Sequence, residues 1–312
     1  MEIADLILPV FAVIVTGWVA GWSGFLPRDL ANALIQFAYN VAMPALLIVT
    51  IAQEPAGALA NWRFLLAFGG GSMLCFVLVF GVLRLRREGS LASQTIRGMA
   101  ASMTNTGFVA LPVLKAVYGA PAVLPAAIAT VFVAVVMFPI AVVLLEYGRD
   151  DGRGGRRDPF RLVWQVAVNP MVSSTVLGML WSALGLGMPA GIGAYLAILA
   201  DALTPCALFA IGLGLSVQGL RASAGTAAWL TAVKLVVMPA IVCALSRLVD
   251  LGPLDTAAAV VCAAVPTAKT MYILAGRFHC EEALVASTVS MTTLCSIASL
   301  IAWLYAFSAA GL

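Results

Sequence analysis

The chain has 312 residues, of which 62% are hydrophobic and only 10% are charged, and its mean hydropathy is +1.05. A soluble domain averages about 45–50% apolar and about 25% charged residues, so the composition excludes an ordinary soluble protein and indicates a membrane protein with many spans. The excess of 17 Lys and Arg over 14 Asp and Glu is too small to indicate a nucleic-acid partner.

Ten apolar segments reach the roughly 20 residues that a helix needs to cross a bilayer. In chain order they are 3–22, 30–51, 62–83, 94–118, 122–145, 162–184, 191–217, 226–248, 254–276 and 283–307. Acidic rather than basic residues precede the first segment, which is therefore expected to be an uncleaved helix. The six cysteines show no metal-ligand spacing, so neither a metal nor another cofactor is predicted.

The longest connection, EYGRDDGRGGRRDPFR at 146–161, is charged and rich in glycine. It divides the chain into five segments in 1–145 and five in 162–312. If this linker is cytoplasmic, twelve arginines fall on the cytoplasmic side and two on the other. The positive-inside rule then predicts a multi-pass protein of a bacterial inner membrane with both termini in the periplasm. With five spans in each half, a homologous second half must be inverted.

Several glycines and prolines recur at an offset of 161 residues, which is the spacing expected of such a repeat. The matched pairs are Pro9 and Pro170, Gly17 and Gly178, Gly24 and Gly185, and Pro44 and Pro205. Together with the matching hydropathy layout, these pairs predict an all-helical protein with a 5+5 inverted repeat. The same offset places Asn105 of the fourth segment on Pro266 of the ninth.

The fourth and ninth segments carry helix-breaking and hydrogen-bonding residues where a spanning helix is expected to be continuous. The two stretches are TNTGFVALP at 104–112 and VPTAKT at 265–270. A membrane helix satisfies its own backbone groups, so an opening at mid-depth is tolerated only where it lines a cavity or is buried in protein. Paired openings at matching places in two inverted halves indicate the binding site of a transporter.

Each opening creates a half-helix N-terminus, whose free N–H groups and partial positive charge attract carboxylates. Interhelical packing is the structural alternative, because Gly, Pro, Ser, Thr and Asn often serve it in membrane helices. The predicted substrate-binding residues are the polar and helix-breaking residues of both openings and an amide of the second segment: Thr104, Asn105, Thr106, Gly107, Pro112, Pro266, Thr267, Lys269, Thr270 and Asn40.

Lys269 lies three residues after Pro266, near the middle of the ninth segment. A lysine at this depth costs about 2.5–3.5 kcal/mol on insertion scales and usually faces a cavity or a partner. It is interpreted as a fixed cation for an anionic substrate or as a tethered substitute for Na⁺. The structural alternatives are an ion pair and a contact with backbone carbonyls.

Four further residues are singled out in the other segments. Asp201 and Lys234 are predicted to be coupling or structural charges, and Pro44 and Pro205 to kink the second and seventh segments. The sequence contains no H-E-x-x-H, G-x-S-x-G or P-loop motif, so an enzyme or an ATP-driven pump has no visible machinery.

The chain resembles the auxin efflux carrier family, which comprises the plant PIN-FORMED carriers and their bacterial relatives. The resemblance covers essentially the whole chain. Its motifs are TNTGFVALP (104–112), NPMV (169–172), PCALFAIGLGLS (205–216), KLVVMP (234–239) and VPTAKTMYILA (265–275).

This resemblance implies ten spans in a 5+5 inverted repeat, like that of bile acid:sodium symporters and sodium/proton antiporters. The first, second, sixth and seventh spans would form a scaffold, with a homodimer through the second and seventh. The other six would form the transport domain, in which the broken fourth and ninth spans cross. Asn105 matches an asparagine that meets the substrate carboxylate in the plant carriers. Bacterial members are often described as malonate or related carboxylate transporters.

The chain departs from the plant pattern in its short 146–161 linker and in Lys269, which favours a smaller acid than auxin. The resulting hypothesis is a secondary active or facilitative transporter of mono- or dicarboxylates such as malonate, working by alternating access. One alternative is a cation/proton antiporter of the same architecture, for which Asp201 is the candidate acid. The other is a membrane sensor that transports nothing.

Overall fold

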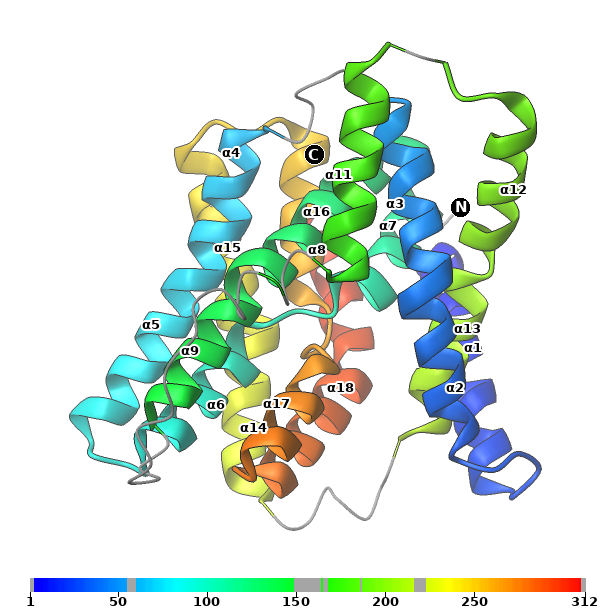
Figure 1. The fold of residues 1–312 in the computed structure, drawn as a ribbon. Coiled ribbons are helices and arrows are strands. Elements are labelled where there is room, and N and C mark those ends of the chain that lie inside the picture. Colours follow the sequence, from blue (N-terminus) through cyan, green and yellow to red (C-terminus); the bar gives the residue numbers. More distant parts are fainter. Residues whose placement is uncertain are drawn as a thin grey trace.

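The computed structural model describes residues 3–54, 60–148, 164, 168–185, 187–215 and 223–309, and this part of the chain is helical throughout except for turns and one isolated β-bridge (Figure 1). Helices occupy each of the ten predicted segments. Most of the 146–161 linker lies outside the described residues. Within the described residues, six continuous helical stretches are long and apolar enough to cross a membrane: Leu30–Ala52, Trp62–Leu85, Ala120–Gly148, Ala190–Leu213, Ala224–Leu248 and Glu282–Phe307.

The elements of the first half are α1 (Ile3–Trp22), α2 (Leu30–Phe37), η1 (Ala38–Ala42), α3 (Met43–Ala52), α4 (Trp62–Phe64), η2 (Leu65–Gly69), α5 (Gly70–Leu85), α6 (Leu91–Ser102), η3 (Thr106–Ala110), α7 (Leu111–Tyr118), η4 (Ala120–Ala122), α8 (Val123–Phe132), η5 (Val133–Met137) and α9 (Phe138–Gly148). Those of the second half are α11 (Pro170–Ala183), α12 (Ala190–Asp201), α13 (Leu203–Leu213), α14 (Ala224–Ala232), η7 (Val233–Val237), α15 (Met238–Leu248), α16 (Pro253–Ala264), α17 (Thr270–Phe278) and α18 (Glu282–Ala309).

Wide π-helical turns precede four prolines inside the helices. The turns η1, η3, η5 and η7 each end two residues before a proline, namely Pro44, Pro112, Pro139 and Pro239. Proline has no N–H group and its ring clashes with the carbonyl of the preceding turn, and a widened turn relieves that clash. The predicted irregularity at Pro44 takes this form. Pro205 instead lies in the first turn of α13, just after the break at Ala202 that separates α12 from α13.

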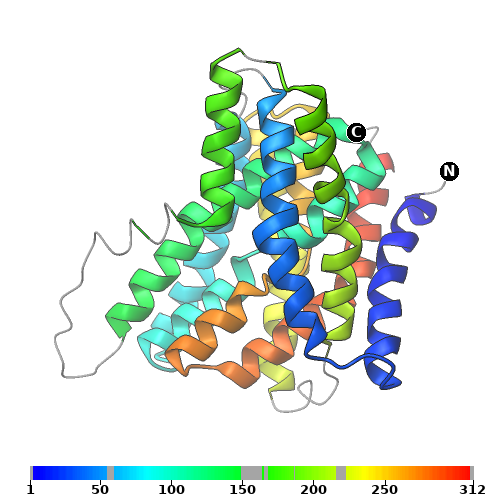
Figure 2. The same ribbon diagram turned by 45° about the vertical axis from the view of Figure 1, so that its right-hand side comes forward.

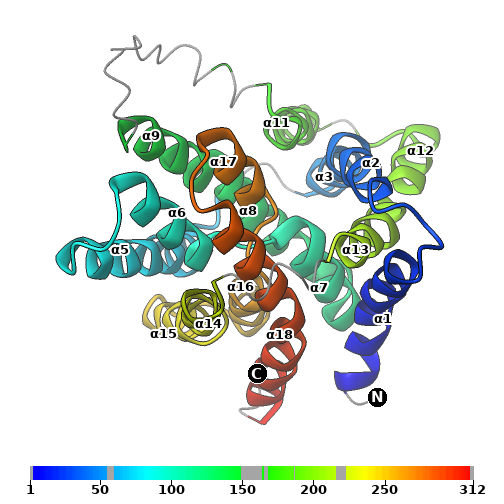
Figure 3. The same cartoon turned by 90° about the horizontal axis from the view of Figure 1, so that it is seen from below.

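Glycines allow the backbone of α1 to approach that of α13 closely, and the backbone of α11 to approach that of α3. A Cβ added at Gly17 would lie 2.2 Å from the carbonyl oxygen of Phe209, and one at Gly178 would lie 3.4 Å from that of Ile48. The two contacts are related by the 161-residue offset, because Gly17 matches Gly178 and Ile48 matches Phe209. Figure 3 shows α1 beside α13 and α11 beside α3 on one side of the molecule. Small residues permit such close approach in membrane helices.

The helices α1 to α3 and α11 to α13 pack together as one group. The other helices form a second group, in which polar contacts join the first and second halves of the chain at both ends of the group. At one end the Asn61 side chain donates to the Asp255 carboxylate over 2.9 Å and also accepts from the N–H of Phe64. At the other end one oxygen of Glu281 accepts from Ser93 and from Arg97, whose Nη2 lies 2.7 Å away. α1 of the first group contacts α18 of the second (Figure 2).

Candidate functional site

The two predicted openings lie against each other in the middle of the molecule. The first separates α6 from η3 and the second separates α16 from α17. Thr104 and Thr267 form an antiparallel bridge between them. On either side of it, the N–H of Asn105 donates to the carbonyl of Pro266 over 2.9 Å, and the N–H of Ala268 donates to the carbonyl of Met103 over 3.1 Å. Backbone groups that the broken helices leave free are thus satisfied partly by each other.

These two backbone bonds have the reciprocal pattern of an antiparallel bridge. Thr104 and Thr267 are 163 residues apart, and the same shift converts the Asn105–Pro266 bond into the Ala268–Met103 bond. The expectation that Asn105 matches Pro266 in a repeat stays a prediction, and the structure joins these two residues by a backbone hydrogen bond.

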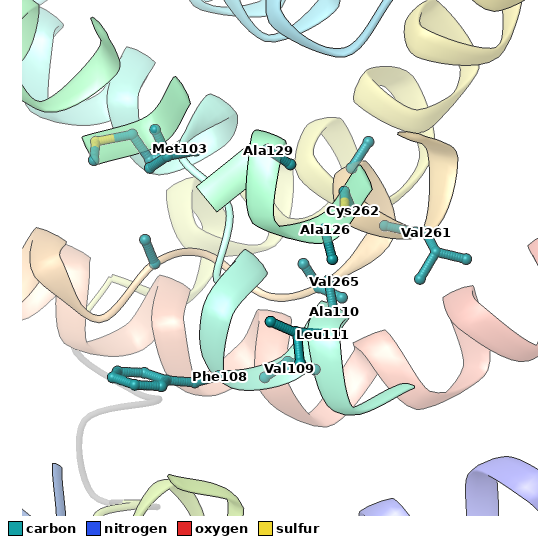
Figure 4. Close-up of a cluster of buried hydrophobic side chains, with 14 of the residues drawn as sticks. Met103, Phe108, Val109, Ala110, Leu111, Ala126, Ala129, Val261, Cys262 and Val265 are labelled. Atoms are coloured by element: carbon teal, nitrogen blue, oxygen red, sulfur yellow. The ribbon is translucent and has the colours of Figure 1, made fainter. Parts of the chain in front are cut away.

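Buried apolar side chains surround the openings. Figure 4 shows Met103, Phe108 and Leu111 as members of one buried cluster that also contains side chains of α8 and α16. Met103 and Val265, which flank the bridge, are fully buried. Thr267 is also fully buried, and its hydroxyl donates to the carbonyl of Ala100 over 2.7 Å. A polar group in such surroundings costs free energy unless it finds a partner.

Several polar groups at the openings do lack a partner within the described part of the chain. The hydroxyls of Thr104 and Thr270 are buried and make no hydrogen bond there. Asn105 is 7% exposed and its side chain does not cap η3. Because η3 and α17 begin at Thr106 and Thr270, both half-helices direct the positive ends of their dipoles at this region, although the N–H groups of Met271 and Tyr272 in α17 already donate to Ala268 and Lys269.

The other predicted residues of the first opening pack against neighbouring spans. The hydroxyl oxygens of Thr106 and Thr130 lie 3.0 Å apart, so Thr106 has a partner in α8. A Cβ added at Gly107 would lie 2.3 Å from the terminal methyl of Met43, so this glycine lets α3 approach the opening. Pro112 is buried in the first turn of α7. The sequence did not reveal Thr130 or Met43 as neighbours, because the contacts join different spans.

Both lysines of the second half contact backbone carbonyls near helix C-termini. Lys269 directly precedes α17, and its Nζ lies 3.4 Å from the carbonyl oxygen of Ala210 in the last turn of α13. Lys234 is fully buried in η7 and donates to the carbonyl of Ala263 at the end of α16. Cations are stabilised at helix C-termini by the helix dipole. For Lys269 this contact is one of the alternatives left open by the sequence, and it holds the ammonium beside the second opening.

Among the hydrogen bonds and ion pairs of the described residues, none joins Asp201 or Asn40 to the openings. Asp201 ends α12, and its carboxylate lies 3.2 Å from Nζ of Lys115 in α7. Both side chains are substantially exposed. Asn40 is exposed and donates to the carbonyl of Gln36, one turn back in its own helix. Within the described residues, no three His, Cys, Asp or Glu side chains gather as metal ligands.

Comparisons with known proteins cover almost the entire chain. A family model described as "Membrane transport protein" matches residues 3–154 and 156–304. A Rhizobium meliloti protein named "Putative malonate transporter" is 26% identical over 97% of this chain and 95% of its own length. "Uncharacterized transporter YfdV" of Escherichia coli is 25% identical over 97% and 96%. "Auxin efflux carrier component 5" of Arabidopsis thaliana is 23% identical over 97% and 95%.

Proposed function

Because this chain belongs to the membrane transport protein family of the auxin efflux carriers, it is a multi-pass membrane transporter and not an enzyme, and we propose that it carries small organic anions, mono- or dicarboxylates such as malonate. The related protein whose name mentions malonate is only 26% identical, so the substrate class is argued from the site.

This proposal rests on the hydrogen-bond donors that have no acceptor among the described residues where the two openings meet. Thr104 and Thr270 supply hydroxyls, Asn105 supplies an amide, and η3 supplies a half-helix N-terminus. All of these donate hydrogen bonds to a carboxylate, and the helix dipoles favour its negative charge. Lys269 adds a positive charge beside the second opening. A cation would find no carboxylate among these groups.

The proposed mechanism is alternating access by an inverted repeat of ten spans in a bacterial inner membrane, with both termini periplasmic and the 146–161 linker cytoplasmic. It is supported by the meeting of the two broken segments at the openings and by the glycine contacts at Gly17 and Gly178, whose residues share the 161-residue offset. In this proposal 1–145 and 162–312 are the repeats. Spans 1, 2, 6 and 7 form the scaffold, and the six others move against it with the bound substrate.

We also propose a homodimer through the second and seventh spans. In this proposal the contact face includes Ile192, Tyr195 and Ile198, which α12 exposes at helical spacing.

The test is uptake of labelled malonate and monocarboxylates into proteoliposomes, with and without Na⁺ and pH gradients. Asn105→Ala and Thr270→Val should each raise the KM about tenfold or more, because a hydrogen bond to a charged group contributes about 1.5–3 kcal/mol. Thr16→Val is the matched control, since the Thr16 hydroxyl bonds only to Ala12 of its own exposed helix face. An unchanged KM in both variants would exclude the crossing as the site. Absence of any carboxylate flux would favour the sensor.

A further inference from the structure

A threonine of the last span, Thr292 in α18, hydrogen-bonds to the backbone of the second opening. In the bridge between the openings, the hydrogen bonds are made by the residues on either side of Thr104 and Thr267, so the N–H of Thr267 points away from the first opening. That N–H donates to the hydroxyl oxygen of Thr292 over 3.2 Å. The second opening is thus bonded to the first opening on one side and to α18 on the other.

The Thr292 oxygen can accept this bond because its own proton is already used. The hydroxyl of Thr292 donates to the carbonyl of Thr288, one turn back in α18, over 2.7 Å. A hydroxyl has one proton and two lone pairs, so the oxygen still accepts from the N–H of Thr267. Thr267 and Thr292 are both fully buried, and a buried N–H that lacks an acceptor costs free energy.

The other two threonines of α18 make no such contact. Thr288 and Thr293 are buried, and their hydroxyls donate to the carbonyls of Leu284 and Val289 in the same helix. Within the described part of the chain, these are the only hydrogen bonds of the two hydroxyls. Of the three threonines that bond back to their own helix, Thr292 alone also accepts from a broken segment.

We propose that Thr292 is a positioning residue for the substrate site, which it serves by holding the second opening through the N–H of Thr267. This inference rests on the proposed function. The ammonium of Lys269 and the hydroxyl of Thr270 follow Thr267 by two and three residues, so a fixed Thr267 limits where both groups lie. A binding site must hold its groups to within about 0.5 Å, and a backbone anchor from a neighbouring helix provides such support.

Hydrogen–deuterium exchange tests the bond without any substrate. Thr292→Val keeps the shape of the side chain and removes the acceptor, so the amide of Thr267 should exchange about fivefold faster or more, measured by mass spectrometry on peptides that cover 265–270. Thr288→Val is the matched control, because it removes a buried hydroxyl of the same kind one turn away, and it should leave this exchange unchanged. Thr292→Ser keeps the acceptor and should restore wild-type exchange. Equal exchange in Thr292→Val and Thr288→Val would overturn the inference.

Uptake into proteoliposomes tests whether the bond positions the site. The KM for malonate should rise about fivefold for Thr292→Val and stay within about twofold of the wild-type value for Thr292→Ser and Thr288→Val. If Thr292 served only the packing of α18, Thr292→Val would lower the melting temperature and leave the KM unchanged. That result would overturn the inference.

A second variant covers the case in which Thr292→Val does not fold. Thr292→Cys retains a side chain of similar size whose sulfur is only a weak acceptor, so it should speed the exchange of 265–270 and raise the KM in the same direction. Wild-type exchange and a wild-type KM in Thr292→Cys would contradict the role of Thr292.

Asn105→Ala separates a failure of this inference from a failure of the proposed function. If Asn105→Ala raises the KM while Thr292→Val does not, the substrate site stands and the role of Thr292 is wrong. If Thr292→Val speeds the exchange but neither variant changes the KM, the bond is real and the proposed substrate site is wrong, and the positioning role fails with it.

Discussion

Lys269→Met is the substitution that best separates the two interpretations of this residue. The side chain lies at the start of α17, beside the second opening, and its ammonium contacts the carbonyl of Ala210 in α13. Methionine keeps most of the length and apolar stem of the side chain and removes only the charge. If the ammonium attracts the substrate, the substitution changes the KM. If it only stabilises α13, the substitution lowers the melting temperature and leaves the KM unchanged.

The expected magnitude follows from the position of Lys269 next to the half-helix N-terminus. A carboxylate bound there would lie within about 4–6 Å of the ammonium, the range over which an opposite charge acts strongly. At an effective dielectric constant of about 20, a separation of about 6 Å gives roughly 2–3 kcal/mol. Since about 1.4 kcal/mol corresponds to a factor of ten, the KM for a carboxylate should rise roughly 30-fold to 150-fold.

The assay is initial uptake of labelled malonate into proteoliposomes over a range of concentrations. Lys115→Met is the matched control, because it removes the same charge from the exposed pair with Asp201 and should change the KM less than about fivefold. A Lys269→Met protein with an unchanged KM and a lower melting temperature would refute the electrostatic role. It would leave the contact with Ala210 as the only function of this lysine.

Two further predictions concern the spans that surround the openings. Asp201→Asn should leave the pH dependence of uptake unchanged and alter stability by less than about 1 kcal/mol, because the pair with Lys115 is exposed; loss of proton-driven flux would instead favour the cation/proton antiporter. Gly212→Ala should destabilise the protein by more than about 1–3 kcal/mol in thermal unfolding, since the added Cβ would lie 1.8 Å from the backbone oxygen of Ile14. Gly81→Ala, with nothing within 4 Å of its Cβ, should be neutral or stabilising, and equal melting temperatures for the two variants would contradict the packing of α1 on α13.

The sequence led to the correct family because its motifs are local. The TNTGFVALP and VPTAKT stretches interrupt apolar segments in a way that a single pass along the chain detects, and the comparisons confirm the family that they indicated. The same local signals place both helix breaks correctly, between α6 and η3 and between α16 and α17. Composition and segment length were sufficient for the class of multi-pass membrane transporter.

The contact between the two openings required coordinates. The sequence indicates a helix break in each segment, whereas only the structure shows Thr104 opposite Thr267 in an antiparallel bridge. Residues 163 positions apart along the chain meet there, and no local pattern specifies that pairing.

The contacts of the charged residues could also be identified only from the tertiary structure. From the sequence, Lys234 is a lysine about two turns inside the eighth segment, and only the packing of η7 against α16 brings it to the carbonyl of Ala263. The pairing of Asp201 with Lys115 joins the seventh and fourth spans in the same way.

By itself, then, the sequence determined what depends on neighbours along the chain: apolar length, helix breaks, and the residue types at the two openings. Only the tertiary structure decided which hydroxyls there already have partners. Thr104 and Thr267 are the same residue type at the two openings, yet within the described residues the Thr104 hydroxyl has no partner while that of Thr267 donates to the carbonyl of Ala100. Hydrogen-bond satisfaction depends on distances in space, and no spacing along the chain specifies them.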